Sequence, residues 1–143
     1  MMYTSRSNYN LAPPWMRIAA GLVDVMFLSM LYVVLNDYVP DIVSNNGLQT
    51  IYASNILFLI LVPIYFILTP LLFNGRTIGK GLFGLRIIRI NGAPIKPSDS
   101  VARTLGYYVG SMLFYLGFLG LFTNELRQGW HDQVAGTTVI MGN

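Results

Sequence analysis

The feature that most constrains this chain is an apolar run from Ile51 to Phe73 that holds no charged residue. At about 1.5 Å of rise per residue, a helix of this length crosses the roughly 30 Å hydrocarbon core of a bilayer. Pro63 cannot donate a hydrogen bond to the carbonyl of Leu59, so a kink is expected there, and a neighbouring helix or side chain has to satisfy that oxygen. The run predicts a transmembrane helix.

Two further apolar runs extend from Trp15 to Leu35 and from Val101 to Phe122. Pro13 and Pro14 precede the first of them, and proline at a helix start loses no internal hydrogen bond. Residues 98–100 supply N-cap candidates for the other. We therefore expect an all-α membrane protein with three transmembrane helices, at about 15–35, 51–73 and 101–122, in a single domain that covers residues 1–143.

The third run leaves two arrangements open. As one complete crossing it places the C-terminal tail on the side opposite to the N-terminus. The glycines at 117 and 120 could instead break the run into a re-entrant pair that returns to its starting side. Gly106 and Gly110 lie four residues apart and suit close helix packing, either within the chain or between two copies.

The placement of basic residues predicts the orientation. The 36–50 loop has no Lys or Arg, whereas the 74–100 loop holds most of the nine in the chain, namely Arg76, Lys80, Arg86, Arg89 and Lys96. Because cytoplasmic loops carry an excess of Lys and Arg, we expect a multi-pass protein of the cell membrane with its N-terminus and the 74–100 loop in the cytoplasm. The net charge of +3 then favours anionic lipid headgroups over nucleic acid as the partner of these cations.

Within that loop, Asn91-Gly92 separates Leu85–Ile90 from Ala93–Lys96. Asn-Gly between apolar runs is a strong hairpin signal, so we expect a short cytoplasmic hairpin. Upstream, Gly79–Gly84 has the glycine spacing of a dinucleotide loop. It lacks a strand before it and a helix after it, so we interpret it as a turn-forming loop.

The residue types available limit the chemistry. The chain has no cysteine and a single histidine, His131. Thiol catalysis, cysteine zinc sites, multi-histidine metal centres and a catalytic triad therefore lack their parts, and we expect no enzyme activity, cofactor or bound metal. The segment from Arg127 to Asp132 has two open roles: it caps a helix end, or Trp130 anchors it at headgroup depth.

Asp24 is the least expected residue of the first apolar run. A lone carboxylate deep in a bilayer costs at least about 2.5 kcal/mol, so it needs a partner or a proton. Arg17 is seven residues earlier and shares its helix face, and Arg103 is the other candidate cation. Asp24 therefore either binds a cation or exchanges a proton, or it forms a structural ion pair with Arg17 or Arg103.

Several of these segments together resemble the RDD family of small prokaryotic membrane proteins, named for an arginine and two aspartates. They are Arg17–Asp24, Thr77–Ile87, Asn91-Gly92, Arg103 and Trp130–Ile140, with Trp130 where leucine is more usual. The resemblance covers most of the chain. It implies that Arg17, Asp24 and Asp132 are the residues to test, and that transport, including cation/proton antiport, is the function to consider.

Our leading hypothesis is a transporter of small cations coupled to protons, in which Asp24 is alternately protonated and charged while Arg17 and Arg103 shift that balance. Three spans can hardly enclose a pathway, so this hypothesis requires a homo-oligomer or another membrane protein. The competing hypothesis is a non-transporting adaptor or regulatory subunit. The candidate residues are an intramembrane cluster of Arg17, Asp24, Arg103 and Asp132, and loop positions Gly79, Lys80, Gly81 and Arg86.

Overall fold

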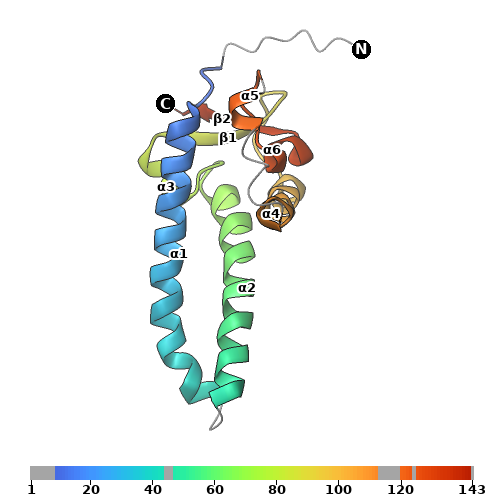
Figure 1. The fold of residues 1–143 in the computed structure, drawn as a ribbon. Helices are drawn as coiled ribbons and strands as arrows, with labels where there is room; N and C mark the ends of the chain where they lie inside the picture. Colours follow the sequence, from blue (N-terminus) through green and yellow to red (C-terminus); the bar gives the residue numbers. More distant parts are fainter. Residues whose placement is uncertain (1–8, 44–46, 113–119, 124, 143) are drawn as a thin grey trace.

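Two long helices, α1 (Pro14–Val43) and α2 (Gly47–Leu72), form the body of the protein. The computed structural model describes residues 9–43, 47–112, 120–123 and 125–142. In Figure 1 the two helices lie side by side and run in opposite directions. Their most apolar stretches, Pro14–Asp37 and Asn55–Leu72, are long enough to cross a membrane and only 17% and 11% buried. A core helix of a soluble protein is mostly buried, so the two exposed surfaces match helices that face lipid.

The other elements gather at the end where α1 begins and α2 ends (Figure 1). They are α3 (Ile78–Leu82), β1 (Leu85–Arg89), α4 (Pro97–Met112), α5 (Gly120–Thr123), α6 (Trp130–Ala135) and β2 (Thr137–Met141). We call this set the head. Its small apolar core contains Ala12, Ala20, Leu85, Ile87 and Val139. The Ala12 N–H also donates to the Val139 carbonyl at 3.0 Å, which fixes the start of α1 to the head.

The expectation of an all-α fold with a local hairpin is wrong in its strand pairing. β1 pairs antiparallel with β2, in a register that joins Leu85 to Met141 and Arg89 to Thr137. The Asn91-Gly92 turn does form, with Gly92 at φ 82° and its N–H donating to the Arg89 carbonyl at 2.8 Å. Beyond the turn, one isolated bridge, Ile88 to Pro94, joins the two arms, and the Arg89 N–H donates to the Ala93 carbonyl at 2.9 Å. The C-terminal strand takes the place that the local arm was expected to fill.

The structure describes the third apolar run only in part. Its described part, α4, has 16 residues and is seen almost end-on beside α2 in Figure 1. Only α1 and α2 among the described helices are long and apolar enough to span a membrane. Residues 113–119, which include the expected break at Gly117, lie outside the described part of the chain. Because β2 pairs with β1, the described C-terminal strand lies at the same end as the start of α1.

Two packing expectations are confirmed at α4. The Tyr108 hydroxyl donates to the Leu59 carbonyl at 3.2 Å, which satisfies the oxygen that Pro63 leaves without a donor. A Cβ atom placed on Gly106 would lie 2.6 Å from the Cα of His131, so this glycine allows α4 and α6 of one chain to touch. Gly110 has no neighbour within 4 Å of such a Cβ atom. Of the two glycines, Gly106 serves packing within the chain.

Candidate functional site

Asp24 sits at the junction of α1, α2 and α3, with none of its surface exposed. The Tyr65 hydroxyl and the Gly79 N–H donate to its Oδ1 at 2.6 and 2.7 Å, and the Thr77 hydroxyl donates to its Oδ2 at 2.6 Å. The Lys80 ammonium lies 4.0 Å from Oδ2. We call these five residues the Asp24 centre. Three neutral donors hold the carboxylate, and one cation stands beyond hydrogen-bond range of it.

The start of the short helix α3 supplies two of the hydrogen-bond donors to Asp24. Thr77 is its N-cap, and its hydroxyl oxygen accepts from the Lys80 N–H at 3.2 Å while the same hydroxyl donates to Asp24. A Cβ atom on Gly79 would collide with the Ala20 carbonyl and lie 3.0 Å from the Asp24 Cγ. Glycine therefore lets the backbone of α3 approach α1 closely enough for its N–H to reach the carboxylate.

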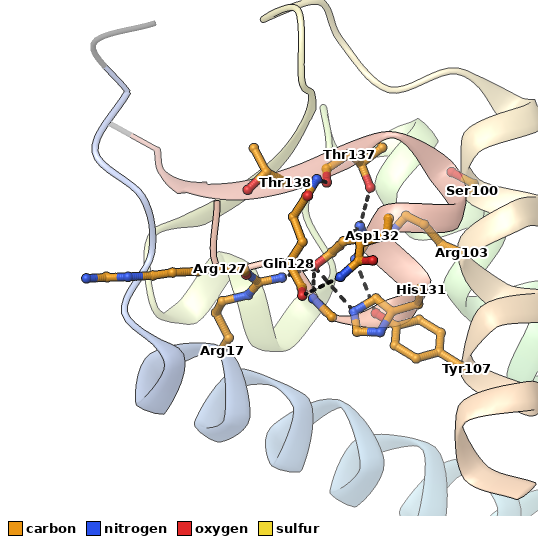
Figure 2. A network of polar contacts seen from close by, with 12 residues as sticks. Arg17, Ser100, Arg103, Tyr107, Arg127, Gln128, His131, Asp132, Thr137 and Thr138 are labelled. Carbon is orange, nitrogen blue, oxygen red and sulfur yellow. Dashed lines mark hydrogen bonds and ion pairs between the residues drawn. The ribbon is translucent and has the colours of Figure 1, made fainter. Parts of the chain in front are cut away.

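Asp132 forms a second centre at the start of α6, and it is also fully buried. Arg17 donates to its Oδ2 and Arg103 to its Oδ1, so one carboxylate joins α1, α4 and α6 (Figure 2). The Gly129 N–H adds a longer capping bond to Oδ2 at 3.3 Å. Arg103 donates further to the Thr137 hydroxyl at 2.6 Å, and Arg17 to the Arg127 carbonyl. We call Arg17, Arg103 and Asp132 the Asp132 centre.

Electrostatics fixes the charge states of this centre. Burial alone would raise the pKa of Asp132, but the adjacent Arg103 and Arg17 charges lower it well below its ordinary value. Burial lowers the pKa of the neighbouring His131 to about 3, with Asp132 opposing that shift and Arg103 adding to it. His131 is therefore neutral at physiological pH, stacked on Tyr107 with 4.3 Å between ring centroids. The Asp132 centre keeps a net charge of +1.

A cavity of about 740 Å³ opens between α1, α2 and α4 and connects the two centres. Asp24 and Lys80 line it, as do Arg17, Arg103 and His131. The rest of its wall is mostly apolar, from residues that include Leu22, Val25, Phe58, Val62 and Phe66. The cavity thus combines a polar end at the head with an apolar wall along the long helices.

The structure brings together most of the candidate residues but changes their pairing. Asp24 is held by Tyr65, Thr77, Gly79 and Lys80, so the ion pair with Arg17 or Arg103, one of the two roles considered for it, does not form. Both arginines bind Asp132 instead. Arg127 to Asp132 includes a helix start, with Gly129 as the N-cap of α6 and Trp130 47% exposed, so the segment has features of both expected roles.

Two loop candidates lie outside both centres. Gly81 is exposed, and a Cβ atom added there would meet nothing within 4 Å. Arg86 points to a different cavity, beside the end of α2. Gly79 and Lys80, by contrast, belong to the Asp24 centre.

Sequence reasoning missed several residues that hold the centres. Tyr65 was counted as part of an apolar span, although a tyrosine hydroxyl inside such a span needs a partner. Thr77 was named only as the first residue of Thr77–Ile87, one of the segments that resemble the RDD family. Gln128, whose amide donates to the Thr137 carbonyl at 2.6 Å, gave no signal, because its partner is positioned by the β1–β2 pairing.

Comparison with known families shows which family the chain belongs to. The model of the RDD family matches residues 11–136, which include both centres. The chain belongs to the RDD family. Of the arginine and two aspartates that carried the resemblance, Arg17 and Asp24 line the cavity, and Asp132 is bound by Arg17 and Arg103, which line it too.

Relatives of this RDD protein come from Bacillus subtilis (strain 168). The uncharacterized protein YxaI is 24% identical over 88% of this chain and 94% of its own length, and the uncharacterized protein YckC is 26% identical over 92% and 85%. The uncharacterized membrane protein YteJ is 28% identical over 88% and 78%. No solved structure matches. The family and the membrane relative, together with the two candidate spans, identify this RDD protein as a membrane protein.

Proposed function

We propose that this RDD protein exchanges a small cation for protons across the membrane, with Asp24 as the cation-binding carboxylate. The observation that carries the proposal is the position of Lys80. Its ammonium faces Asp24 at 4.0 Å, is almost fully buried and lines the cavity between α1, α2 and α4. A cation that enters the cavity competes with this ammonium for the same carboxylate.

The exchange balances in charge and atoms. The Lys80 ammonium releases one proton to water and becomes a neutral amine, and one monovalent cation takes its place beside the Asp24 carboxylate. The reverse step returns the proton and releases the cation. The Tyr65 and Thr77 hydroxyls that now donate to Asp24 also carry lone pairs that can coordinate a hard cation, so the site needs little rearrangement.

The proposal includes a membrane arrangement and an assembly. The head and the N-terminus face the cytoplasm, as the basic residues of the 74–100 loop favour. The third apolar run enters the membrane and returns, which agrees with the outward apolar stripe of α4 at Val101, Leu105 and Val109, whose residues are 42%, 60% and 50% exposed. Because two long helices cannot enclose a path, a second copy of the chain completes the pathway.

Flux measurements in proteoliposomes test the proposal. With purified protein and an imposed sodium or potassium gradient, we expect proton movement that a pH-sensitive dye inside the vesicles records. Asp24→Asn and Lys80→Gln should each abolish this movement. Asp37→Asn, which neutralises an exposed carboxylate on the same helix, should leave it unchanged. Normal flux in Asp24→Asn, or no flux in the wild type with any alkali cation, would reject the transport mechanism.

One observation favours a second candidate, a non-transporting adaptor. Asp24 accepts three hydrogen bonds from groups that the fold fixes in place, which suits a permanent structural anion. On this alternative the charged centres set helix register, and the exposed apolar helix faces bind another membrane protein. Crosslinking in native membranes should then trap one recurrent partner, and recovery of self-contacts alone would count against the adaptor.

A further inference from the structure

A second cavity, of about 540 Å³, lies at the end of α2 where the chain turns into α3. Arg76 and Arg86 both line it. Its other walls include Leu72, Phe73 and Ile78, whose residues are 71%, 58% and 38% exposed. This cavity therefore combines two guanidinium groups with an apolar rim that continues the surface of a membrane helix.

The side chains of Arg76 and Arg86 both pass close to Gly142 and line the same cavity. A Cβ atom built on Gly142 would lie 3.2 Å from the Arg76 Nη2 and 3.7 Å from the Arg86 Cδ. The backbone holds this geometry, because the Gly142 N–H donates to the Gly84 carbonyl at 2.7 Å directly after β2. Two cations that the fold brings together repel each other unless an anion lies between them.

Within the described part of the chain, no carboxylate supplies that anion. The buried or partly buried acids of the head are paired elsewhere: Asp24 with Lys80, Asp99 with Arg89, and Asp132 with Arg17 and Arg103. The Nε atoms of both Arg76 and Arg86 are buried and have no hydrogen-bond acceptor among the described residues. Buried donors of this kind are costly to leave unsatisfied, so the pair is prepared for an external acceptor.

We propose that Arg76 and Arg86 form a binding site for a phosphate group, and that the phosphate belongs to the headgroup of an anionic phospholipid. A guanidinium presents paired N–H donors that match the oxygens of a phosphate. The apolar rim of Leu72, Phe73 and Ile78 favours a lipid over free phosphate, because it gives the acyl chains a surface next to the headgroup. The site shares no residue with the Asp24 centre, so evidence for or against it does not bear on the transport proposal.

Native mass spectrometry of the full chain in detergent tests the site, with phosphatidylglycerol as the probe and phosphatidylcholine as the zwitterionic comparison. We expect the Arg76→Gln/Arg86→Gln double variant to lose affinity for phosphatidylglycerol by about tenfold or more. Lys96→Gln is the matched control, since it removes one exposed cation from the same loop and should change the affinity little.

The Arg86→Lys variant distinguishes specific hydrogen bonding from non-specific charge attraction. Lysine keeps the positive charge but lacks the paired N–H donors of a guanidinium group. Loss of most of the affinity in this variant supports the site. Full affinity in Arg86→Lys, or an equal loss in Lys96→Gln, overturns it. Displacement of phosphatidylglycerol by an excess of inorganic phosphate, with no preference for the lipid, overturns the lipid source and assigns the pair to free phosphate. Proton flux in the Arg76→Gln/Arg86→Gln vesicles reports separately on transport.

Discussion

Asp24 and Asp132 are both fully buried, and their centres border the same cavity, but different kinds of group hold them. Two guanidinium groups neutralise Asp132 and join α1 and α4 to α6. Neutral donors hold Asp24, and its single cation stays 4.0 Å away. Two arginines that bind a carboxylate directly are difficult to displace from it. A carboxylate that has a single ammonium at a distance can exchange that ammonium for another cation. We therefore expect the Asp132 centre to serve stability, and the proposed exchange to take place at the Asp24 centre.

The largest expected effect is a loss of stability in Asp132→Asn. The substitution leaves Arg17 and Arg103 buried without their shared anion, which should cost about 3–5 kcal/mol of unfolding free energy. Unfolding in detergent, followed by circular dichroism, measures it. Glu125→Gln, which neutralises an exposed acid, is the control. If both variants unfold alike, Asp132 does not carry the stability of the head.

The second prediction concerns acid. Folded His131 has a pKa of about 3, while the unfolded side chain titrates near its ordinary 6.5. Between these values the unfolded state binds more protons, so stability should fall as pH drops below 6.5, by roughly 1 kcal/mol per pH unit. Melting temperatures from pH 7 to 5 measure it, and His131→Phe should flatten the curve. An equal slope in the variant would place the acid sensitivity elsewhere.

The third prediction uses two glycines of α3. Gly79→Ala introduces a collision with the Ala20 carbonyl and pushes α3 away from Asp24, at a cost of about 1–3 kcal/mol. Gly81→Ala has open space and should be neutral or slightly stabilising. Unfolding free energies of the two variants in the same detergent give the contrast. Equal values would mean that the backbone of α3 does not need its close approach to α1.

The smallest expected effect compares Tyr65 of the Asp24 centre with Tyr107, which contacts Arg103 of the Asp132 centre. Tyr65→Phe removes a 2.6 Å hydrogen bond to the Asp24 carboxylate and should cost about 1.5 kcal/mol. Tyr107→Phe removes a 3.3 Å bond from Arg103, which keeps its bonds to Asp132 and Thr137, so it should cost about 0.5 kcal/mol. Unfolding free energies rank the pair. The reverse order would mean that the longer bond to Arg103 contributes more to stability than the short bond to the Asp24 carboxylate.

The sequence was informative wherever the signal was local. Hydropathy located α1 and α2, and the missing N–H of Pro63 predicted the need for a donor that Tyr108 supplies to Leu59. The partners of Asp24 could not be predicted in this way. A shared helix face suggested Arg17, but the choice depends on where the fold places Gly79 of α3 and Asp132 of α6. Long-range strand pairing, rather than helix periodicity, decides which charges meet.

The joining of Arg17 to Asp132 has a consequence for biosynthesis. The ribosome makes the arginine of α1 long before the aspartate of α6, so the first helix enters the bilayer with a guanidinium that has no counter-ion. Only translation of the last segment supplies the carboxylate that Arg17 and Arg103 share. Termination before Asp132 would leave both arginines without the carboxylate that they share.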